Sequence, residues 1–419
     1  MKPVTAKNVD QNELSVSPQW DVCRDAPHDM PLMFDAEYEM TELFRNLFIF
    51  EIANNHQGTL AHGLAIVRAM SRIARKRQVR AGVKLQYRDL DTFIHADYCQ
   101  RKDVKHVPRF LSTRLQNDEF QVLVEAIRDE GLISIATPFD EPSVRTCIDH
   151  GVEILKIASC SATDWPLLKE VAESGRPVIV STGGLDIWEI DSIVSFLTHR
   201  HCRFALMHCV AIYPTPNGAA QMHFLDKLRM RYPGLPVGYS GHEAPENLNL
   251  ARIAVAKGAE LLERHVGLPT ESITLNAYSM DPSQTDAWIE AALDSQIACG
   301  DRGRKRVSQE EIDSLQSLKR GAYALRGIQA GEPFAPDDVF FAMPCHDGQV
   351  TSGAFGRYRT TYVASRDYQA GDPIFEHARP DQISRERAVI HDVKGMLHEA
   401  HIAVGNDFEI ELSHHYGIE

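Results

Sequence analysis

The stretch LLERHVG, Leu261–Gly267, begins as a buried β-strand would and ends in three charged or titratable residues. Two explanations fit Glu263, Arg264 and His265 at the end of an apolar run. In the first, the strand reaches the protein surface there and Glu263 only pairs with Arg264. In the second, several strands end in this way and their ends together form one site. The remainder of the sequence favours the second explanation.

Seven earlier segments have the same character, each a short and nearly continuous run of apolar or β-branched residues, as expected for strands covered on both faces. They read LFIFEIA, AGVKLQ, LISIATPF, VEILKIAS, RPVIVSTGG, RFALMHCV and LPVGYSGH. Helical patterns separate them, and two of these close on Gly175 and Gly258, which are C-cap candidates. Eight strands alternating with helices over residues 46–300 predict a closed (β/α)8 TIM barrel. An open doubly wound sheet is the alternative, but no GxGxxG follows the first strand.

Four further regions flank the predicted barrel. Residues 1–45 are polar and contain several prolines, which predicts an N-terminal arm with little regular structure. Residues 301–318 predict a linker helix, and residues 319–378 are turn-rich with two QAG turns, which predicts a small β-rich domain. The C-terminal tail, 379–419, has a helix-like and a strand-like segment and is expected to begin a further module.

Composition and charge exclude several classes of function. The 419 residues include 44 Lys plus Arg and 58 Asp plus Glu, a net charge of −14 without a basic run, so neither nucleic acid nor a membrane is an expected partner. No apolar stretch approaches the ~20 residues that span a bilayer, and the N-terminus does not resemble a secretory signal, so a cytoplasmic location is expected. The eight cysteines form no CxxC pair, and Cys160 and Cys209 are expected to be core thiols.

Polar side chains stand at the end of every predicted strand. In a TIM barrel the C-terminal ends of the strands carry the active site, so these side chains are expected to converge. In chain order they are Glu51, Lys84, Gln86, Thr137, Lys156, Ser159, Ser181, Thr182, His208, Tyr213, Ser240, His242, Glu263 and His265. A single polar strand end means little, but eight in succession predict a site.

One group within this set suggests an anion cradle. Lysine binds phosphate as a point charge, and hydroxyl groups complete the oxygen shell. The candidate ligands are Lys84, Thr137, Lys156, Ser159 and Ser240. A lone lysine at a barrel end is as often part of a structural ion pair, whereas two lysines with three hydroxyls favour phosphate binding.

A second group suggests a metal site. His242 and His265 come from adjacent predicted strands, so their imidazoles can converge on one divalent ion and leave positions open for substrate or water. Hydrogen-bonded core histidines are the alternative, and the residues alone leave both possibilities open. Glu51 is a candidate general acid or base, or could orient a metal-bound water.

Eight short motifs occur along the chain in the order FIFEIANNHQG, VKLQ, ATPFD, LKIAS, PVIVSTGG, HCVAIYPTP, VGYSGH and LLERHVG. Together they resemble the sialic acid synthase family, which consists of phosphoenolpyruvate-condensing barrels with a C-terminal antifreeze-like (SAF) domain. The β-rich region 319–378 resembles that SAF domain. The resemblance implies condensation of phosphoenolpyruvate with the open-chain aldehyde of an N-acylated hexose. The products would be a nonulosonic 2-keto-3-deoxy sugar acid and phosphate.

The resemblance also implies roles for individual residues. Phosphoenolpyruvate would be bound by Lys84, Thr137, Lys156, Ser159 and Ser240. His242 and His265 would hold Mn²⁺ or another divalent cation such as Mg²⁺. Glu51 would act at the reacting centre and Tyr213 would line the pocket, which makes both candidate catalytic residues. The family resemblance further implies a domain-exchanged homodimer, in which the small domain covers the barrel mouth of the partner.

Departures from the family pattern lie mainly on the sugar side. Ala211 stands where the family has an asparagine, Ser161 where it has an acidic residue and Gly241 where it has an aspartate. Met343 aligns with the arginine that grips the substrate in the C-terminal domain. The sequence therefore predicts a divergent synthase with an unusual acceptor.

Two other functions stay open at this point. A catalytically silent relative could bind a sugar or phosphoenolpyruvate as a scaffold, and the changes at Ala211 and Ser161 support that alternative. An aldolase-type lyase could form an imine between pyruvate and Lys156. An imine lysine needs a desolvated setting, and the neighbouring hydroxyls and histidine pair argue against this alternative.

Overall fold

In the computed structural model the chain is described at residues 43–300, 307–355, 362–377 and 393. It divides into two units, Met1–Gly300 and Asp301–Glu419. Nearly all of the predicted N-terminal arm, 1–45, and of the predicted tail, 379–419, lies outside the described residues. Those two predictions therefore stay predictions.

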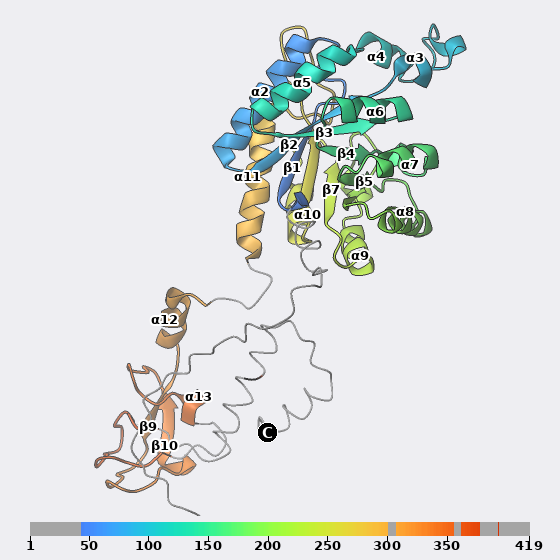
Figure 1. The fold of residues 1–419 in the computed structure, drawn as a ribbon. Helices are drawn as coiled ribbons and strands as arrows, with labels where there is room; N and C mark the ends of the chain where they lie inside the picture. Colours follow the sequence, from blue (N-terminus) through green and yellow to red (C-terminus); the bar gives the residue numbers. More distant parts are fainter. Residues whose placement is uncertain (1–42, 301–306, 356–361, 378–392, 394–419) are drawn as a thin grey trace, which may run out of the picture. The chain divides into compact units, whose positions relative to one another are not determined.

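The first unit contains a closed barrel of eight parallel strands in chain order, which confirms the predicted TIM barrel and excludes the open sheet (Figure 1). The strands are β1 (Leu47–Glu51), β2 (Arg80–Tyr87), β3 (Ile133–Pro138), β4 (Ile154–Ile157), β5 (Val178–Ser181), β6 (Phe204–Cys209), β7 (Val237–Gly241) and β8 (Leu261–His265). β8 closes the barrel against β1, and His265 lies opposite Glu51 in that register. LLERHVG is thus the last strand, and its charged end lies beside the end of the first.

Helices follow the strands and cover the outside of the barrel (Figure 1). They are α2 (Leu60–Arg77), α3 (Leu90–Phe93), α4 (Val107–Ser112), α5 (Asn117–Asp129), α6 (Glu141–Asp149), α7 (Trp165–Glu173), α8 (Ile187–His199), α9 (His223–Arg231), α10 (Asn249–Ala256) and α11 (Pro282–Cys299). Gly175 and Gly258 follow α7 and α10 with φ values of +67° and +78°, the left-handed conformation expected after a helix end. Among the described residues, no helix is long and apolar enough to cross a membrane.

The strands place alternate side chains inside and outside the barrel. On β8, Leu261 belongs to an inner apolar cluster, whereas Leu262 packs in the outer core between strands and helices. Glu263 and His265 share the inward side with Leu261, and Arg264 shares the outward side with Leu262. The charged end of this strand therefore serves two different surfaces.

Apolar side chains fill the barrel below the polar strand ends. Their inner cluster consists of Phe44, Leu47, Ile49, Ile135, Ile154, Ile179, Ala205, Met207 and Leu261. Gly238 allows the close approach of β7 and β8, because a Cβ atom there would lie 2.5 Å from the Leu261 carbonyl oxygen. Within the described barrel, the polar side chains at the strand ends lie above this apolar floor and face inward.

The second unit has its own small core. It contains α12 (Gln309–Ser317), the antiparallel pair β9 (Gly321–Ala324) and β10 (Val339–Ala342), and α13 (Ser352–Phe355). The segments at the two QAG turns pair with each other, since Ile328 and Tyr368 exchange backbone hydrogen bonds of 3.0 and 2.8 Å. This unit is rich in turns and short strands, and its assignment as an antifreeze-like domain stays a prediction.

Candidate active site

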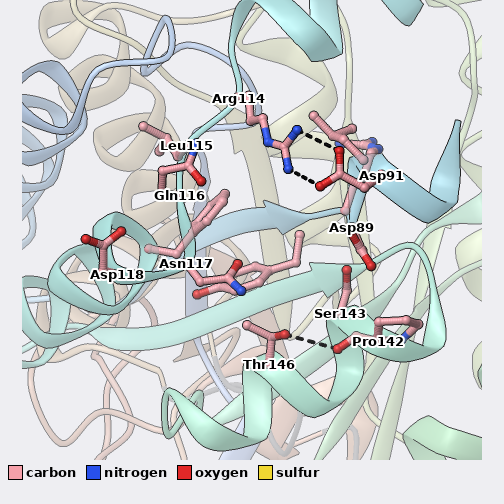
Figure 2. Close-up of a pocket in the computed structure, with 14 residues that line it drawn as sticks. Asp89, Asp91, Arg114, Leu115, Gln116, Asn117, Asp118, Pro142, Ser143 and Thr146 are labelled. Carbon is pink, nitrogen blue, oxygen red and sulfur yellow. Dashed lines mark hydrogen bonds and ion pairs between the residues drawn. The ribbon is translucent and has the colours of Figure 1, made fainter. Parts of the chain in front are cut away.

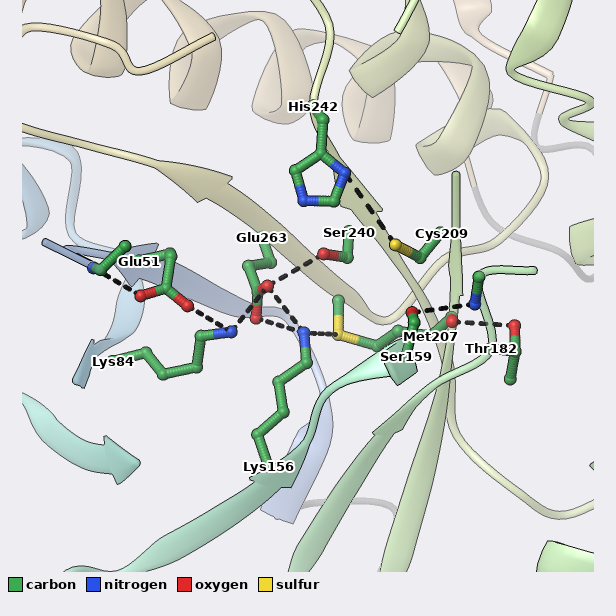
Figure 3. Close-up of polar contacts among 12 residues, drawn as sticks. Glu51, Lys84, Lys156, Ser159, Thr182, Met207, Cys209, Ser240, His242 and Glu263 are labelled. Carbon is green, nitrogen blue, oxygen red and sulfur yellow. Dashed lines mark hydrogen bonds and ion pairs between the residues drawn. The ribbon is translucent and has the colours of Figure 1, made fainter. Parts of the chain in front are cut away.

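The carboxylate of Glu263 lies at the centre of a buried cluster of charged groups in the barrel (Figure 3). Its Oε1 accepts hydrogen bonds from Lys84 Nζ at 2.9 Å and from Lys156 Nζ at 2.6 Å. Oε2 lies 2.7 Å from Lys156 Nζ, and Ser240 Oγ donates to Oε1 at 2.9 Å. Glu263 therefore links strands β2, β4, β7 and β8, and the explanation in which it only pairs with Arg264 is wrong.

Glu51 completes the cluster from β1. Its Oε2 lies 2.6 Å from Lys84 Nζ, and its Oε1 accepts the backbone N–H of Ala53 at 2.6 Å. The four side chains of Glu51, Lys84, Lys156 and Glu263 are each at most 5% exposed. Two ammonium groups and two carboxylates thus form a buried set with balanced charge, which is the condition under which ions are tolerated in a protein interior.

The cluster shifts the proton affinities of its members. Burial alone would raise the pKa of Glu263, but the ammonium groups of Lys156 and Lys84 outweigh it and hold that pKa well below its usual range. Burial alone would lower the pKa of Lys84, and the carboxylates of Glu263 and Glu51 reverse the effect and raise it. For Lys156 burial dominates, so its pKa falls to about 8 although Glu263 is bound to it.

The three predicted hydroxyl ligands differ in their contacts. Ser240 bonds directly to Glu263, whereas Ser159 Oγ accepts the backbone N–H of Gly183 at 3.0 Å (Figure 3). Thr137 Oγ1, at the inward end of β3, is buried and has no hydrogen-bond partner among the described residues. A buried hydroxyl without a partner costs free energy, so a ligand oxygen that accepts a hydrogen bond from Thr137 would be stabilised there.

The predicted histidine pair forms where β7 and β8 end, with ring centroids 5.3 Å apart. His242 Nδ1 lies 3.1 Å from the Val210 carbonyl oxygen, which assigns the proton to Nδ1 and leaves a lone pair on Nε2. His265 Nδ1 is buried and has no partner within the described chain. Burial lowers the pKa of both rings to about 3, His242 also through its neighbour His265 and His265 also through Lys84. Both imidazoles are neutral at physiological pH, the state that binds a metal ion.

Two tyrosines flank the histidine pair. The ring of Tyr213 lies 4.3 Å from that of His242 and is half exposed, as expected for a residue that lines a pocket. Tyr278 lies 5.1 Å from His265 and 5.2 Å from Tyr213, measured between ring centroids. Sequence reasoning missed Tyr278, because it follows β8 in an irregular segment with no motif that would reveal its proximity.

Arg264 has a separate role behind the strand ends. Its Nη1 donates to Glu243 Oε1 at 2.7 Å, its Nη2 donates to the Glu243 carbonyl at 2.8 Å, and both side chains are fully buried. Tyr239 completes the set by donating to Glu243 Oε2 at 3.1 Å. Since Glu243 follows His242 and Arg264 precedes His265, this ion pair ties the two metal candidates together from the outside of the barrel. Glu243 was also missed, although the alternation along β8 indicates that Arg264 needs an outward partner.

The same ion pair explains one departure from the family pattern. A Cβ atom on Gly241 would lie 2.4 Å from Glu243 Oε2, so an aspartate does not fit at this position without displacing the buried carboxylate. Ser161 is buried in the turn after β4, whereas Ala211 and Met343 are exposed. Nothing in the structure explains the changes at Ala211 and Met343.

Two expectations about other residues are wrong. His208 does not point into the barrel, because the alternation along β6 turns it outward, where its Nε2 lies 2.7 Å from the Ala220 carbonyl oxygen. Cys160 is exposed in the short helical turn Ser159–Ser161 and is not a core thiol, whereas Cys209 is buried beside His242 as expected. In both cases the error concerns where a strand ends or which face a residue occupies.

The donor set for a metal ion consists of two imidazoles. Among the described residues, no three His, Cys, Asp or Glu side chains come together in a metal-binding arrangement. His242 and His265 are neutral, adjacent and include one unpartnered nitrogen, and such a pair fits a divalent ion that takes its other ligands from substrate and water.

Comparisons with known proteins show which family the chain is similar to. The family model of NeuB matches residues 73–304, a range that contains every predicted site residue except Glu51. An uncharacterized protein of Methanocaldococcus jannaschii is 30% identical over 292 residues, 69% of this chain and 82% of that protein. The N-acetylneuraminate-9-phosphate synthase of Mus musculus is 24% identical over 314 residues, 70% of this chain and 86% of that protein. The crystal structure of a Chromobacterium violaceum protein assigned to spore coat polysaccharide biosynthesis superposes with a TM-score of 0.77 at 44% identity, covering 80% of this chain and 100% of that one.

The buried cluster predicts a large effect of removing one charge. Glu263→Gln leaves two buried ammonium groups with only one carboxylate, and we expect the free energy of unfolding to fall by about 3–5 kcal/mol in urea denaturation. The matched control is Glu173→Gln, which removes an exposed charge 3.9 Å from Lys169 and should change stability within experimental error. Equal stability of the two variants would contradict a cohesive charge cluster.

Proposed function

Since this chain belongs to the NeuB family and is a carbon–carbon bond-forming transferase of the N-acetylneuraminate synthase type, we propose that it condenses phosphoenolpyruvate with a sugar aldehyde. The acceptor is the open-chain form of an N-acylated hexose. The products are a nonulosonic 2-keto-3-deoxy sugar acid and inorganic phosphate.

The observation that carries this proposal is the buried lysine cluster and, beside it, hydrogen-bond donors that are available to a ligand. An ammonium group has three N–H donors. Lys84 divides its contacts between Glu51 and Glu263 and so retains a donor for an anion. Lys156 directs two donors to the oxygens of Glu263 and the third to the Met207 sulfur at 3.6 Å, a weak contact that an anion oxygen can replace. Together with the free hydroxyl of Thr137, these donors suit the phosphate and carboxylate oxygens of phosphoenolpyruvate.

In the proposed reaction, the methylene carbon of phosphoenolpyruvate attacks the aldehyde carbon, and the aldehyde oxygen takes up a proton. Water then adds to the resulting cationic carbon, and the bond from this carbon to the bridging oxygen breaks to release phosphate. Lys84 and Lys156 hold the departing phosphate charge throughout, while Glu263 keeps them in place. Glu51, beside Lys84 at the end of β1, accepts the proton of the attacking water, and Tyr213 lines the acceptor side.

A divalent ion, Mn²⁺ or Mg²⁺, is proposed to bind to His242 and His265. The neutral state of both rings and the unpartnered His265 Nδ1 support this assignment. When bound, such an ion acts as a Lewis acid toward a carbonyl oxygen or water. A domain-exchanged homodimer, an antifreeze-like identity for residues 319–378 and a cytoplasmic location are further proposals that follow from the resemblance.

A catalytically silent relative is the second candidate function. It is supported by the loss of the family residues at Ala211 and Ser161. An imine-forming lyase has less support, because the Lys156 ammonium is held by both oxygens of Glu263 and is not free to attack a ketone.

Phosphate release is the direct test of the synthase. We expect release from phosphoenolpyruvate with Mn²⁺ to depend on sugar when N-acyl and plain hexoses and pentoses are compared. Lys156→Met should lower the rate by at least about 100-fold, because it removes a charge-assisted contact to the leaving group. Binding of phosphoenolpyruvate without release for any sugar would favour the silent relative, and covalent trapping of pyruvate by borohydride would favour the lyase.

The affinity for phosphoenolpyruvate should fall as pH rises. The pKa of Lys156 is about 8, so its ammonium is lost above that pH and anion binding weakens. The fall begins near pH 8, the pKa of the free protein, and approaches about tenfold per pH unit. Because the bound anion favours the ammonium and raises its pKa, the fall ends only at that higher pKa. In Lys156→Arg, binding measured by calorimetry should stay level up to about pH 9.5, since arginine keeps its charge. An unchanged profile in this variant would assign the titration to another group.

Binding of Mn²⁺ tests the histidine pair independently of turnover. We expect His265→Ala to weaken the Kd by at least about tenfold in an electron paramagnetic resonance titration of free Mn²⁺, because one of two protein ligands is lost. His223→Ala is the control, since this imidazole is 94% exposed and contacts Asp226 outside the barrel mouth. Equal affinity of the two variants would exclude His265 as a ligand.

A further inference from the structure

Arg88 follows directly on β2, the strand that carries Lys84 and Gln86 on its inward side. Its Nη2 donates to Gln86 Oε1 at 3.0 Å, which fixes the guanidinium above the same strand end as the lysine cluster. Its Nε is buried and has no hydrogen-bond partner among the described residues. The proposed reaction gives Arg88 no role.

Aromatic rings enclose the guanidinium. Its central carbon lies 3.6 Å from the ring centroid of Phe139, 4.2 Å from that of Phe110 and 5.9 Å from that of Phe93. Rings stacked on a guanidinium cover its faces and leave its N–H groups available only at the edges. Such an arrangement holds the group rigid and directs its remaining donors toward a planar or tetrahedral oxyanion.

The charge of Arg88 is not balanced by a carboxylate. Within the described part of the chain, no Asp or Glu forms an ion pair with it, whereas Arg264, which is fully buried, is paired with Glu243. The nearby Asp140 uses its two oxygens to accept the backbone N–H groups of Ser143 and Asp89. Arg88 is half-buried, with its Nε shielded from solvent. Partial burial of an unpaired cation costs free energy, and a bound anion removes that cost.

Two cavities adjoin at Arg88, Leu90, Arg114, Leu115 and Phe120, which line both of them. The smaller has a volume of about 30 Å³, room for one or two water-sized oxygen atoms, and is also lined by Asn54, His56 and Gln86 at the ends of β1 and β2. The larger has a volume of about 420 Å³ and opens between α5 and α6 (Figure 2). Arg114 in this larger pocket is already engaged, since its guanidinium bonds to Asp91 at 2.9 Å (Figure 2).

His56 gives the small cavity a second hydrogen-bond donor besides Arg88. His56 Nδ1 accepts the backbone N–H of Gly58 at 3.1 Å, and burial lowers the pKa of His56 to about 4. The ring is therefore neutral with its proton on Nε2, which is a donor. Gln86, which accepts the hydrogen bond from Arg88, lies on the same side of β2 as Lys84, so the cavity adjoins the strand end that carries the lysine cluster.

From this juxtaposition we propose that Arg88 binds a negatively charged substituent, a carboxylate or a phosphate, on the acceptor sugar. The inference rests on the proposed function and narrows its acceptor to an anionic sugar. The substituent lies distal to the aldehyde, with one oxygen in the small cavity against the edge of the caged guanidinium. The larger pocket gives room for the rest of the substituent.

Binding of matched sugars tests the inference without turnover. Calorimetry compares N-acetylmannosamine with its 6-phosphate and with the corresponding hexuronic acid, which separates phosphate from carboxylate recognition. We expect wild-type protein to bind one of the anionic sugars about 10- to 100-fold more tightly than the neutral one, the range for a charge-assisted contact. In Arg88→Met this preference should shrink to about threefold or less, since the charge and the edge donors are gone.

Two controls make the result specific. Arg200→Met removes an exposed guanidinium that stacks on the ring of Phe196, 3.7 Å from its centroid and outside both cavities, and it should retain the wild-type preference. Arg88→Lys keeps the charge without the planar fork, and if Arg88→Met does not fold, this variant should show an intermediate preference. A wild-type preference near unity, or one that Arg88→Met leaves intact, would overturn the inference. A loss of phosphoenolpyruvate affinity by tenfold or more in Arg88→Met would also overturn it, because Arg88 would then contact the other substrate.

The inference and the proposed function can fail separately. If no sugar drives phosphate release but the anionic preference depends on Arg88, the synthase is wrong and the anion site stands. If sugars drive release and the preference is absent, the synthase stands and the anion site is wrong.

Discussion

A carboxylate shared by two ammonium groups inside the barrel is the constraint on which this structure depends. Glu263 binds Lys84 and Lys156 at 2.6–2.9 Å, and Glu51 neutralises the remaining charge. In a poorly polarisable interior these ions are stable only as a set, so four strands must end in register for any of them to be tolerated. The apolar cluster of the barrel interior lies below these four ions, and the histidine pair lies above them.

The last strand shows how one short sequence serves both sides of the barrel wall. Glu263 and His265 face inward, toward the lysines and the proposed metal position, whereas Arg264 faces outward to Glu243. The outward pair bonds also to the backbone of residue 243, directly after His242. The geometry of the histidine pair is therefore held by an ion pair on the outer side of the strands, which is how rigid sites are commonly supported.

The strand pattern made most of the fold predictable, because eight near-continuous apolar runs separated by helices leave few alternatives to a closed barrel. The convergence of Lys84, Lys156, Ser240, His242 and His265 was predictable for the same reason. The partners of individual side chains were not predictable. An error of one residue in the position of a strand moves a side chain from the inside of the barrel to the outside, as His208 illustrates. Tyr278 and the aromatic cage of Arg88 come from irregular segments, where sequence carries no periodicity to place them.

Charge balance connects the proposed metal ion with the inference about Arg88. The lysine–carboxylate cluster is neutral overall and both imidazoles are uncharged, so these two groups together offer no net positive charge. A phosphate ester carries a charge of about −1.5 to −2 at neutral pH, and the carboxylate of phosphoenolpyruvate adds to it. A divalent ion at the histidines would offset this first substrate. An anionic acceptor then needs a cation of its own, and among the described residues of the mouth Arg88 is a half-buried cation without a carboxylate partner.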